Sequence, residues 1–184
     1  MKKIMMTLAA VLCCAMTTTV LTACGGSDDS GDVPGPDKTP VAGVIKAGIK
    51  VSEDMLKYLD LTVEYYDANG SVQKETMDKT EWSKEVKAKL TAKLGARLLM
   101  KLKDGVDVST LTNTTFAYSY SYRCVAVTSS NEEVGEVLIS SPSFSTTVTN
   151  SEKLSEFINK HKDDGLVKFL FILDGKTITS TDWE

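Results

Sequence analysis

The chain has 184 residues, 42% of them hydrophobic, with 21 basic and 25 acidic side chains and a formal net charge of −4 at pH 7. This length is enough for one domain with its own hydrophobic core. The acidic balance leaves no basic stripe of the kind that nucleic-acid-binding proteins carry, which argues against nucleic acid as a partner.

Residues 1–23 have the layout of an export signal. Lys2 and Lys3 form a positive start, and the stretch from Ile4 to Met16 is almost continuously apolar. The run is short for a bilayer span, and small residues follow it, as they do at a cleavage site. The alternative is an N-terminal membrane helix that stays attached to the chain.

The sequence Leu21-Thr22-Ala23-Cys24 follows this run and consists of an aliphatic residue, two small or polar residues and a cysteine. It resembles the lipobox of bacterial lipoproteins, which signal peptidase II cleaves. The resemblance implies cleavage between Ala23 and Cys24, a diacyl group on the sulfur of Cys24 and an acyl group on its new amine. Each buried methylene contributes about 0.8 kcal/mol, so several acyl chains would anchor the protein stably in a membrane.

Cleavage changes the charge and the cysteine inventory. Removing the first 23 residues takes away two lysines, leaving 19 basic against 25 acidic side chains, a net charge of −6. Direct adhesion to anionic lipid is therefore not expected. Two cysteines leave with the signal and Cys24 is acylated, so Cys124 is the only remaining thiol and no intramolecular disulfide is expected.

Residues 24–40 are predicted to be a lipidated, flexible tether, because their Gly, Ser, Asp and Pro content cannot bury enough surface to order them. Asp28, Asp29 and Asp32 repel one another, and no EF-hand spacing supports the alternative of a calcium site. An acidic patch just after the lipidated cysteine resembles surface lipoproteins of the Bacteroidota type. By the same resemblance, Gly25 in place of Asp does not retain the protein in the inner membrane. The implied location is the outer membrane, at the cell surface more than at the periplasmic face.

Residues 41–184 are expected to form one domain of short strands. The segment 59–66 alternates apolar and polar residues, and Asn69-Gly70 is the strongest short signal for a hairpin turn. An apolar stripe at helical spacing predicts a helix over 151–162. In chain order the predicted elements are an edge strand or linker at 41–50, a helical turn at 55–58, strands at 59–66, 71–77, 82–103, 116–122, 134–139 and 144–149, the helix, and strands at 166–173 and 176–180.

The segment 82–103 is rich in helix formers, but its pattern predicts a strand. Nearly all its apolar residues occupy even positions, and on a helix these would be spread over every face. As one strand it would be about 70 Å long at 3.3 Å per residue, so it must break, and Thr91 to Gly95 is the predicted place. There either a hairpin turns, or one strand bends and crosses between two sheets.

A bulge is predicted near Arg123-Cys124. The strand at 116–122 has its aromatic residues on even positions, whereas Val125 and Val127 continue it on odd positions. An extra residue in one strand shifts the alternation in this way.

The short strands, the Gly and Asn turns and the single helix together predict an antiparallel β-sandwich, Ig-like or transthyretin-like in outline. The nearly continuous apolar segment 166–173 predicts a central strand covered on both faces, and Pro142 marks an edge or a break. The alternative fold is a small antiparallel barrel of the lipocalin type.

The sequence does not point to an enzyme. Its only histidine, His161, lies among lysines at the end of the predicted helix, where a solvated cation is expected. Without a second histidine the zinc-hydrolase patterns fail, and no Gly-x-Ser-x-Gly, P-loop or Rossmann fingerprint is present. Cys124 is expected to be a buried thiol. No catalytic residue, cofactor or metal site is predicted.

One group of residues suggests a binding surface. Tyr118, Tyr120 and Tyr122 share one face of a strand with Phe116, and Trp82 is a further candidate. Stacked tyrosines on a flat sheet bind sugar rings, but packing inside a sandwich explains the same pattern. Two functions remain: a non-catalytic accessory or structural module with a protein partner, or a cell-surface glycan-binding lipoprotein that uses this aromatic face.

Overall fold

The computed structural model describes residues 38–183, which belong to one compact unit. The predicted signal peptide 1–23, its cleavage site at Ala23 and Cys24, and nearly all of the tether 24–40 lie outside the described residues. Within the described range, no helix has the length and apolar character needed to cross a membrane.

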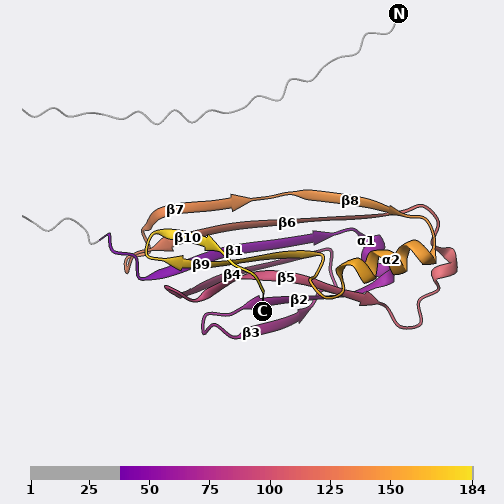
Figure 1. Ribbon diagram of the computed structural model, residues 1–184, viewed down its shortest axis with the longest axis horizontal. Helices are drawn as coiled ribbons and strands as arrows, with labels where there is room; N and C mark the ends of the chain where they lie inside the picture. Colours follow the sequence, from indigo (N-terminus) through magenta and orange to yellow (C-terminus); the bar gives the residue numbers. More distant parts are fainter. Residues whose placement is uncertain (1–37, 184) are drawn as a thin grey trace, which may run out of the picture. The chain divides into compact units, whose positions relative to one another are not determined.

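Two five-stranded antiparallel sheets make up the domain (Figure 1). Its elements are β1 (Ala42–Val51), α1 (Glu53–Tyr58), β2 (Leu59–Tyr66), β3 (Val72–Thr76), β4 (Glu81–Lys89), β5 (Lys93–Leu102), a 3-10 turn (Val108–Thr110), β6 (Thr114–Val127), β7 (Glu133–Ser140), β8 (Ser143–Val148), α2 (Ser151–His161), β9 (Val167–Asp174) and β10 (Thr177–Ser180). The first sheet has the order β4-β1-β6-β7, with β8 also paired to β6, and the second has the order β10-β9-β5-β2-β3. The predicted antiparallel β-sandwich is confirmed, and the two sheets do not close into the lipocalin-type barrel.

β1 is a central strand, so the prediction of an edge strand or linker was wrong. β4 pairs along one side of it and β6 along the other. A Cβ atom on Gly43 would lie 2.9 Å from a methyl of Leu94, and one on Gly48 would lie 2.9 Å from the hydroxyl of Ser121. The crowding on both faces thus requires the small residues that make this segment resemble a linker.

The prediction that 82–103 is extended and broken is confirmed. β4 lies in the first sheet and β5 in the second, so the chain crosses between the sheets, which is the second of the two predicted alternatives. The crossing uses Thr91, whose φ of 68° is in the left-handed region that few non-glycine residues occupy.

The bulge lies in β7, so its predicted position near Arg123-Cys124 was wrong. β6 pairs with β1 in one unbroken register from Tyr118 to Val127, and the register shift with β7 skips two residues of β7. The buried valines on odd positions of β6 pack on the outer face of the first sheet, in a small cluster with Ala42. The change from even to odd apolar positions therefore reflects a second apolar face of β6, on the outside of the sheet, and not a bulge in β6.

β7 and β8 run one after the other along the same border of the first sheet (Figure 1). Ser141 and Pro142 separate them, as the prediction of an edge or break at Pro142 required. The carbonyl of Pro142 accepts a hydrogen bond from the backbone N–H of Tyr120 at 3.2 Å, so the chain stays aligned with β6 across the break. We call this border the β7–β8 edge.

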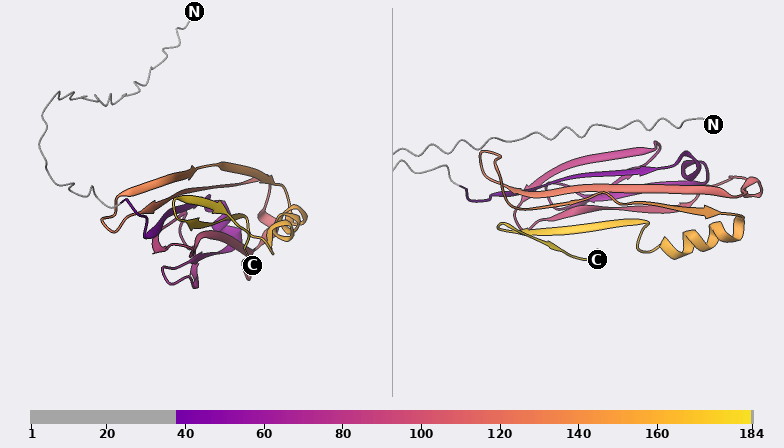
Figure 2. Two further views of the ribbon diagram at one scale, coloured as in Figure 1. Left: turned by 60° about the vertical axis from the view of Figure 1, so that its left-hand side comes forward. Right: turned by 90° about the horizontal axis from the view of Figure 1, so that it is seen from above.

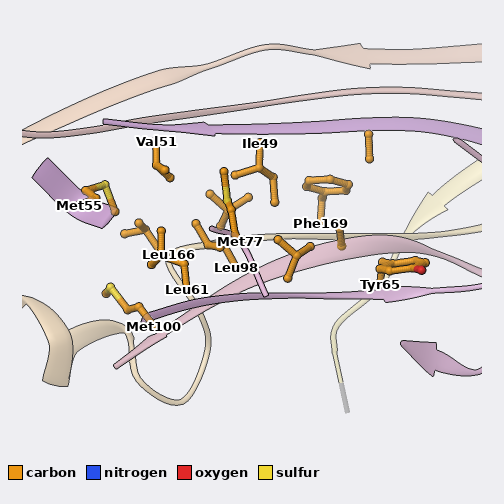
Figure 3. Packing of buried hydrophobic residues seen from close by; sticks show 14 of the residues in the cluster. Ile49, Val51, Met55, Leu61, Tyr65, Met77, Leu98, Met100, Leu166 and Phe169 are labelled. Carbon is orange, nitrogen blue, oxygen red and sulfur yellow. The ribbon is translucent and has the colours of Figure 1, made fainter. Parts of the chain in front are cut away.

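The core lies between the sheets and draws on both of them (Figure 3). Ile49 of β1 and Leu98 of β5 are fully buried, and Phe169 of β9 is 7% exposed. β9 lies between β5 and β10, which confirms that the apolar segment 166–173 is an interior strand. Burying one large apolar side chain contributes about 1.5–3 kcal/mol, so this layer supplies most of the stability of residues 38–183, whose one cysteine, Cys124, is a free thiol.

Candidate functional site

The three tyrosines of β6 face the space between the sheets, and each is partly exposed. The ring of Tyr120 lies 5.6 Å from that of Phe169, and the ring of Tyr122 lies 4.9 Å from that of Phe171. Burial is the main cause that raises the pKa of Tyr118 and of Tyr120, so both hydroxyls are protonated at neutral pH. The rings therefore contribute to packing without being enclosed.

Trp82 does not join the tyrosines. Ile49 of β1 pairs with Trp82 on one side and with Tyr120 on the other, so the two aromatic residues are separated by two strand spacings, about 10 Å. Ile49 is fully buried and fills the space between them. The structure thus keeps Trp82 on the same face of the first sheet as the tyrosines but separates it from them by β1.

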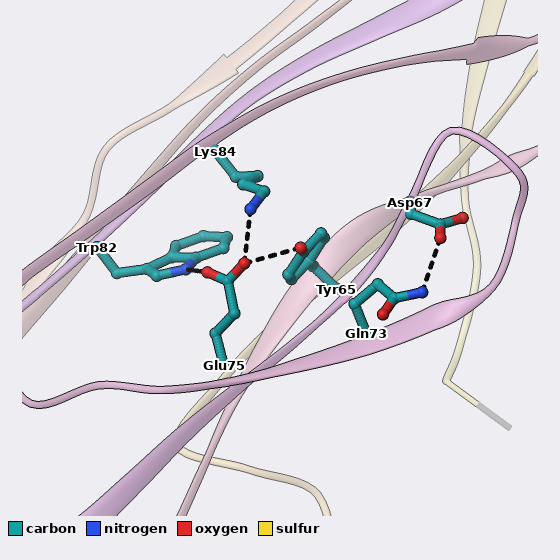
Figure 4. A network of polar contacts seen from close by, with 6 residues as sticks. All are labelled: Tyr65, Asp67, Gln73, Glu75, Trp82 and Lys84. Carbon is teal, nitrogen blue, oxygen red and sulfur yellow. Dashed lines mark hydrogen bonds and ion pairs between the residues drawn. The ribbon is translucent and has the colours of Figure 1, made fainter.

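Trp82 belongs to a polar cluster that joins β3 and β4 at the side of the sandwich (Figure 4). Glu75 accepts hydrogen bonds from the indole N–H of Trp82 at 2.7 Å, from the hydroxyl of Tyr65 at 2.8 Å and from the ammonium of Lys84 at 2.5 Å. The hydrogen bonds from Lys84 and Trp82 lower the pKa of Glu75, and Glu75 in turn raises the pKa of Lys84. Because its polar groups are paired, we assign this cluster to holding the two sheets together.

On the other side of the sandwich a cleft of about 400 Å³ lies between β8 and α2. The rings of Tyr118 and Phe144 line it and stack at 5.1 Å, and Phe157 of α2 lines it from the helix. Its remaining lining residues are Ser145, Thr146, Thr147, Val148, Lys153, Glu156, Lys160 and His161. We call it the β8–α2 cleft.

The polar rim of the β8–α2 cleft carries one unbalanced positive charge. Lys153 pairs with Glu156 at 2.6 Å, whereas Lys160 has no ion pair with any residue in the described part of the chain. Burial, and then the neighbouring charge of Lys160, lower the pKa of His161, so its ring is neutral at pH 7. The cleft therefore combines aromatic walls with one cation, Lys160, that has no ion pair among the described residues.

The β7–β8 edge adjoins this cleft, and from Val137 onwards it lacks charge. None of the residues from Val137 to Val148 is charged. Val137 is 44% exposed, Ile139 64% and Phe144 44%. Half of the large apolar side chains that are exposed in the described part of the chain therefore lie on this edge. The opposite borders, β3 and β4, carry lysine and glutamate side chains, which is how proteins ordinarily protect a sheet edge.

The backbone of the β7–β8 edge presents donors and acceptors to solvent. In an antiparallel sheet, each residue directs its N–H and its C=O to the same neighbouring strand, and successive residues alternate between the two sides of their strand. Since Pro142 bonds to Tyr120 of β6, the groups that point away from β6 belong to the odd-numbered residues. These residues are Val137, Ile139, Ser141, Ser143, Ser145 and Thr147.

The two residues considered for chemistry have different surroundings. Burial raises the pKa of Cys124 to about 12, which leaves the thiol protonated and unreactive. His161 lies in the wall of the β8–α2 cleft, where its ring is 5.3 Å from that of Phe157, and is less solvated than predicted. Among residues 38–183 no group of three or more acidic, histidine or cysteine side chains could hold a metal ion.

The sequence prediction missed the residues that complete this side of the sandwich. Phe144, Phe157 and Lys160 form the β8–α2 cleft with Tyr118, yet they come from separate elements and only the fold brings them together. The charge-free run from Val137 was visible in the sequence, but its position at a border depends on strand order. Comparison with known proteins found no matching family, no similar curated protein and no similar solved structure.

Proposed function

We propose that this protein is a lipid-anchored accessory module of the outer membrane that binds a protein partner and has no catalytic role. The observation that carries the proposal is the β7–β8 edge, which is uncharged from Val137 to Val148 and exposes Val137, Ile139 and Phe144. An unprotected edge of this length pairs readily with another chain, and natural proteins retain such an edge only at a cost. A cognate partner on this edge accounts for its lack of protection.

The chemistry of the described residues supports a binding role. The only thiol left after the predicted processing, Cys124, is buried, and the only histidine, His161, has no carboxylate partner of the kind that catalytic triads use. The anchor rests on the resemblance of Leu21-Thr22-Ala23-Cys24 to a lipobox. Together these features favour a module that holds a partner near a membrane.

The proposal is tested by photo-crosslinking in living cells. A photoreactive amino acid at Ile139 of the full-length protein is expected to give one discrete adduct with another protein, identified by mass spectrometry. The same amino acid at Val72 serves as a control, because this valine is exposed on the opposite, charged border. Equal adduct patterns at the two positions, or no adduct at Ile139, would contradict the proposal.

A second candidate function is glycan binding, which the β8–α2 cleft favours. The stacked pair of Tyr118 and Phe144 is partly exposed there, beside hydroxyl and charged side chains that suit a sugar ring. A glycan array probed with the mature protein in detergent tests this function. Binding that Phe144→Ala abolishes and Trp82→Ala preserves would support it, and an array without binding would exclude it for the glycans displayed.

A further inference from the structure

The second sheet extends past the border of the first. Seen from above, β9, β10 and α2 project beyond the β7–β8 edge (Figure 2, right). At one end of the edge the gap is bridged, because the N–H of Glu136 donates to the carbonyl of Lys176 at 3.1 Å and the carboxylate of Glu136 accepts from the N–H of Ile178 at 3.0 Å. From Val137 onwards no strand formed by residues 38–183 lies over this projecting part of the second sheet. The first sheet therefore has room for one more strand.

We infer that the β7–β8 edge and the β8–α2 cleft form a single site that accepts an extended segment of the protein partner as an additional strand. The inference rests on the proposed function, since it specifies how that partner binds. The segment completes the first sheet and covers the half-exposed rings of Tyr118 and Phe144.

The backbone of the edge suits strand addition along its length. The six outward residues from Val137 to Thr147 offer paired donors and acceptors at two-residue spacing, which is the pattern an added strand requires. Pro142 does not interrupt this pattern, because its nitrogen lies on the side of β6, where its carbonyl already bonds to Tyr120. Charge does not oppose the approach of a partner, since this stretch carries none.

The β8–α2 cleft specifies the side chains of the incoming segment. Every second residue of an added strand would face inward, beside Phe144 and above Phe157, so these positions require apolar side chains. Lys160 is the unbalanced cation at the rim, so a carboxylate at the end of the segment near α2 is favoured. The expected ligand is an extended segment with alternating apolar residues, no positive charge in its middle and an acidic residue at one end.

The projecting elements favour a single segment over the edge of a second copy. Two copies paired edge to edge about a two-fold axis would each bring β9, β10 and α2 into the space beneath the joined strands (Figure 2, right). A lone strand needs only the width of one strand, about 4.8 Å. The site is therefore suited to a flexible segment of another protein.

The test uses the full-length mature protein in detergent and a phage library of linear peptides as long as the stretch Val137–Val148. Selection is expected to enrich peptides with alternating apolar residues and a terminal acidic residue. Ser145→Pro removes an outward N–H, and Val137→Lys adds a charge to the edge, so each is expected to weaken binding of the selected peptide at least about tenfold. Val72→Lys is the matched control, because Val72 and Val137 are both 44% exposed on border strands.

The outcomes separate this inference from the proposed function. Failure to enrich any peptide, or peptides that bind the Val137→Lys and Val72→Lys variants equally, would overturn strand addition. If the Ser145→Pro variant still gives the crosslinked adduct at Ile139 in cells, strand addition is also overturned, while the proposed function remains intact. Peptide binding with no adduct at Ile139 in cells would support the site and contradict the proposed function. Thermal unfolding of each variant checks that the fold is retained.

Discussion

At the scale of single residues, Cys124 gives a direct probe of the fold. It is fully buried, and burial raises the pKa of its thiol to about 12. With the predicted cleavage before Cys24 and the proposed acylation of that residue, Cys124 would be the only free thiol of the mature chain. We expect iodoacetamide at pH 8 to leave the native protein unlabelled and to label one site after unfolding in guanidinium chloride. Native labelling at the rate of a free thiol would contradict the burial.

Glu75 is predicted to make stability depend on pH. Its pKa is lowered in the fold, so its contribution is present above the carboxyl pKa of the unfolded chain and is lost as pH falls through the folded value. Glu75→Gln is expected to lower the free energy of unfolding by about 1–2 kcal/mol at pH 7, a value that allows for its partial exposure, with the difference shrinking towards pH 3. Urea denaturation of both proteins at several pH values measures this difference in unfolding free energy.

The matched control for Glu75→Gln is Glu81→Gln. The carboxylate of Glu81 pairs with Lys50 but its side chain is 67% exposed, so its removal is expected to change the free energy of unfolding by less than about 0.5 kcal/mol. Equal effects of the two variants would mean that the cluster around Glu75 does not join the sheets as described.

At the scale of elements, β5 provides a matched pair of core and surface positions. Leu98 is fully buried between the sheets, whereas Leu102 at the end of the same strand is 42% exposed. Leu98→Ala is expected to cost about 2–5 kcal/mol of unfolding free energy, through lost burial and the cavity left behind, and Leu102→Ala less than about 1 kcal/mol. Denaturant unfolding followed by tryptophan fluorescence measures both, and similar costs would place β5 at the surface.

Alternation predicted the elements well where each strand has one apolar face. It identified β2, and it identified β4 and β5 against their helical composition, because period two cannot produce an amphipathic helix. It failed for β1. Gly43 and Gly48 look like linker residues there, but they are glycines because crowding from neighbouring residues leaves no room for a larger side chain. It also failed at Val125, because a strand with apolar residues on both faces has no single pattern.

The candidate site was less predictable than the elements. The sequence placed the three tyrosines on one face of a strand but left open whether that face was core or surface, and their separation from Trp82 depends on β1 lying between β4 and β6. Likewise Phe144 and Phe157 meet only because β8 and α2 pack at one border. Strand order in a sandwich is set by contacts between distant segments, and no local pattern of residues encodes it.

At the scale of the whole molecule, the resemblance of Leu21-Thr22-Ala23-Cys24 to a lipobox leads to a prediction about processing. Cells fed an alkyne-tagged fatty acid are expected to label the protein, and mass spectrometry is expected to find a mature chain beginning at Cys24. Cys24→Ala should abolish the label, whereas Cys13→Ala should retain it, because Cys13 lies within the predicted signal. Label that persists in Cys24→Ala would contradict anchoring through this residue.

The central claim is that a partner occupies the β7–β8 edge when the protein is in its own membrane. Amide hydrogen exchange tests this most directly, by comparing the protein in isolated outer membranes with the same protein purified in detergent. Our account predicts that the outward amides of the edge, those of the odd-numbered residues from Ile139 to Thr147, exchange slowly in the membranes and rapidly after purification, while those of β3 at the opposite border do not change. Equal exchange of the β7–β8 edge in the two preparations would contradict the account.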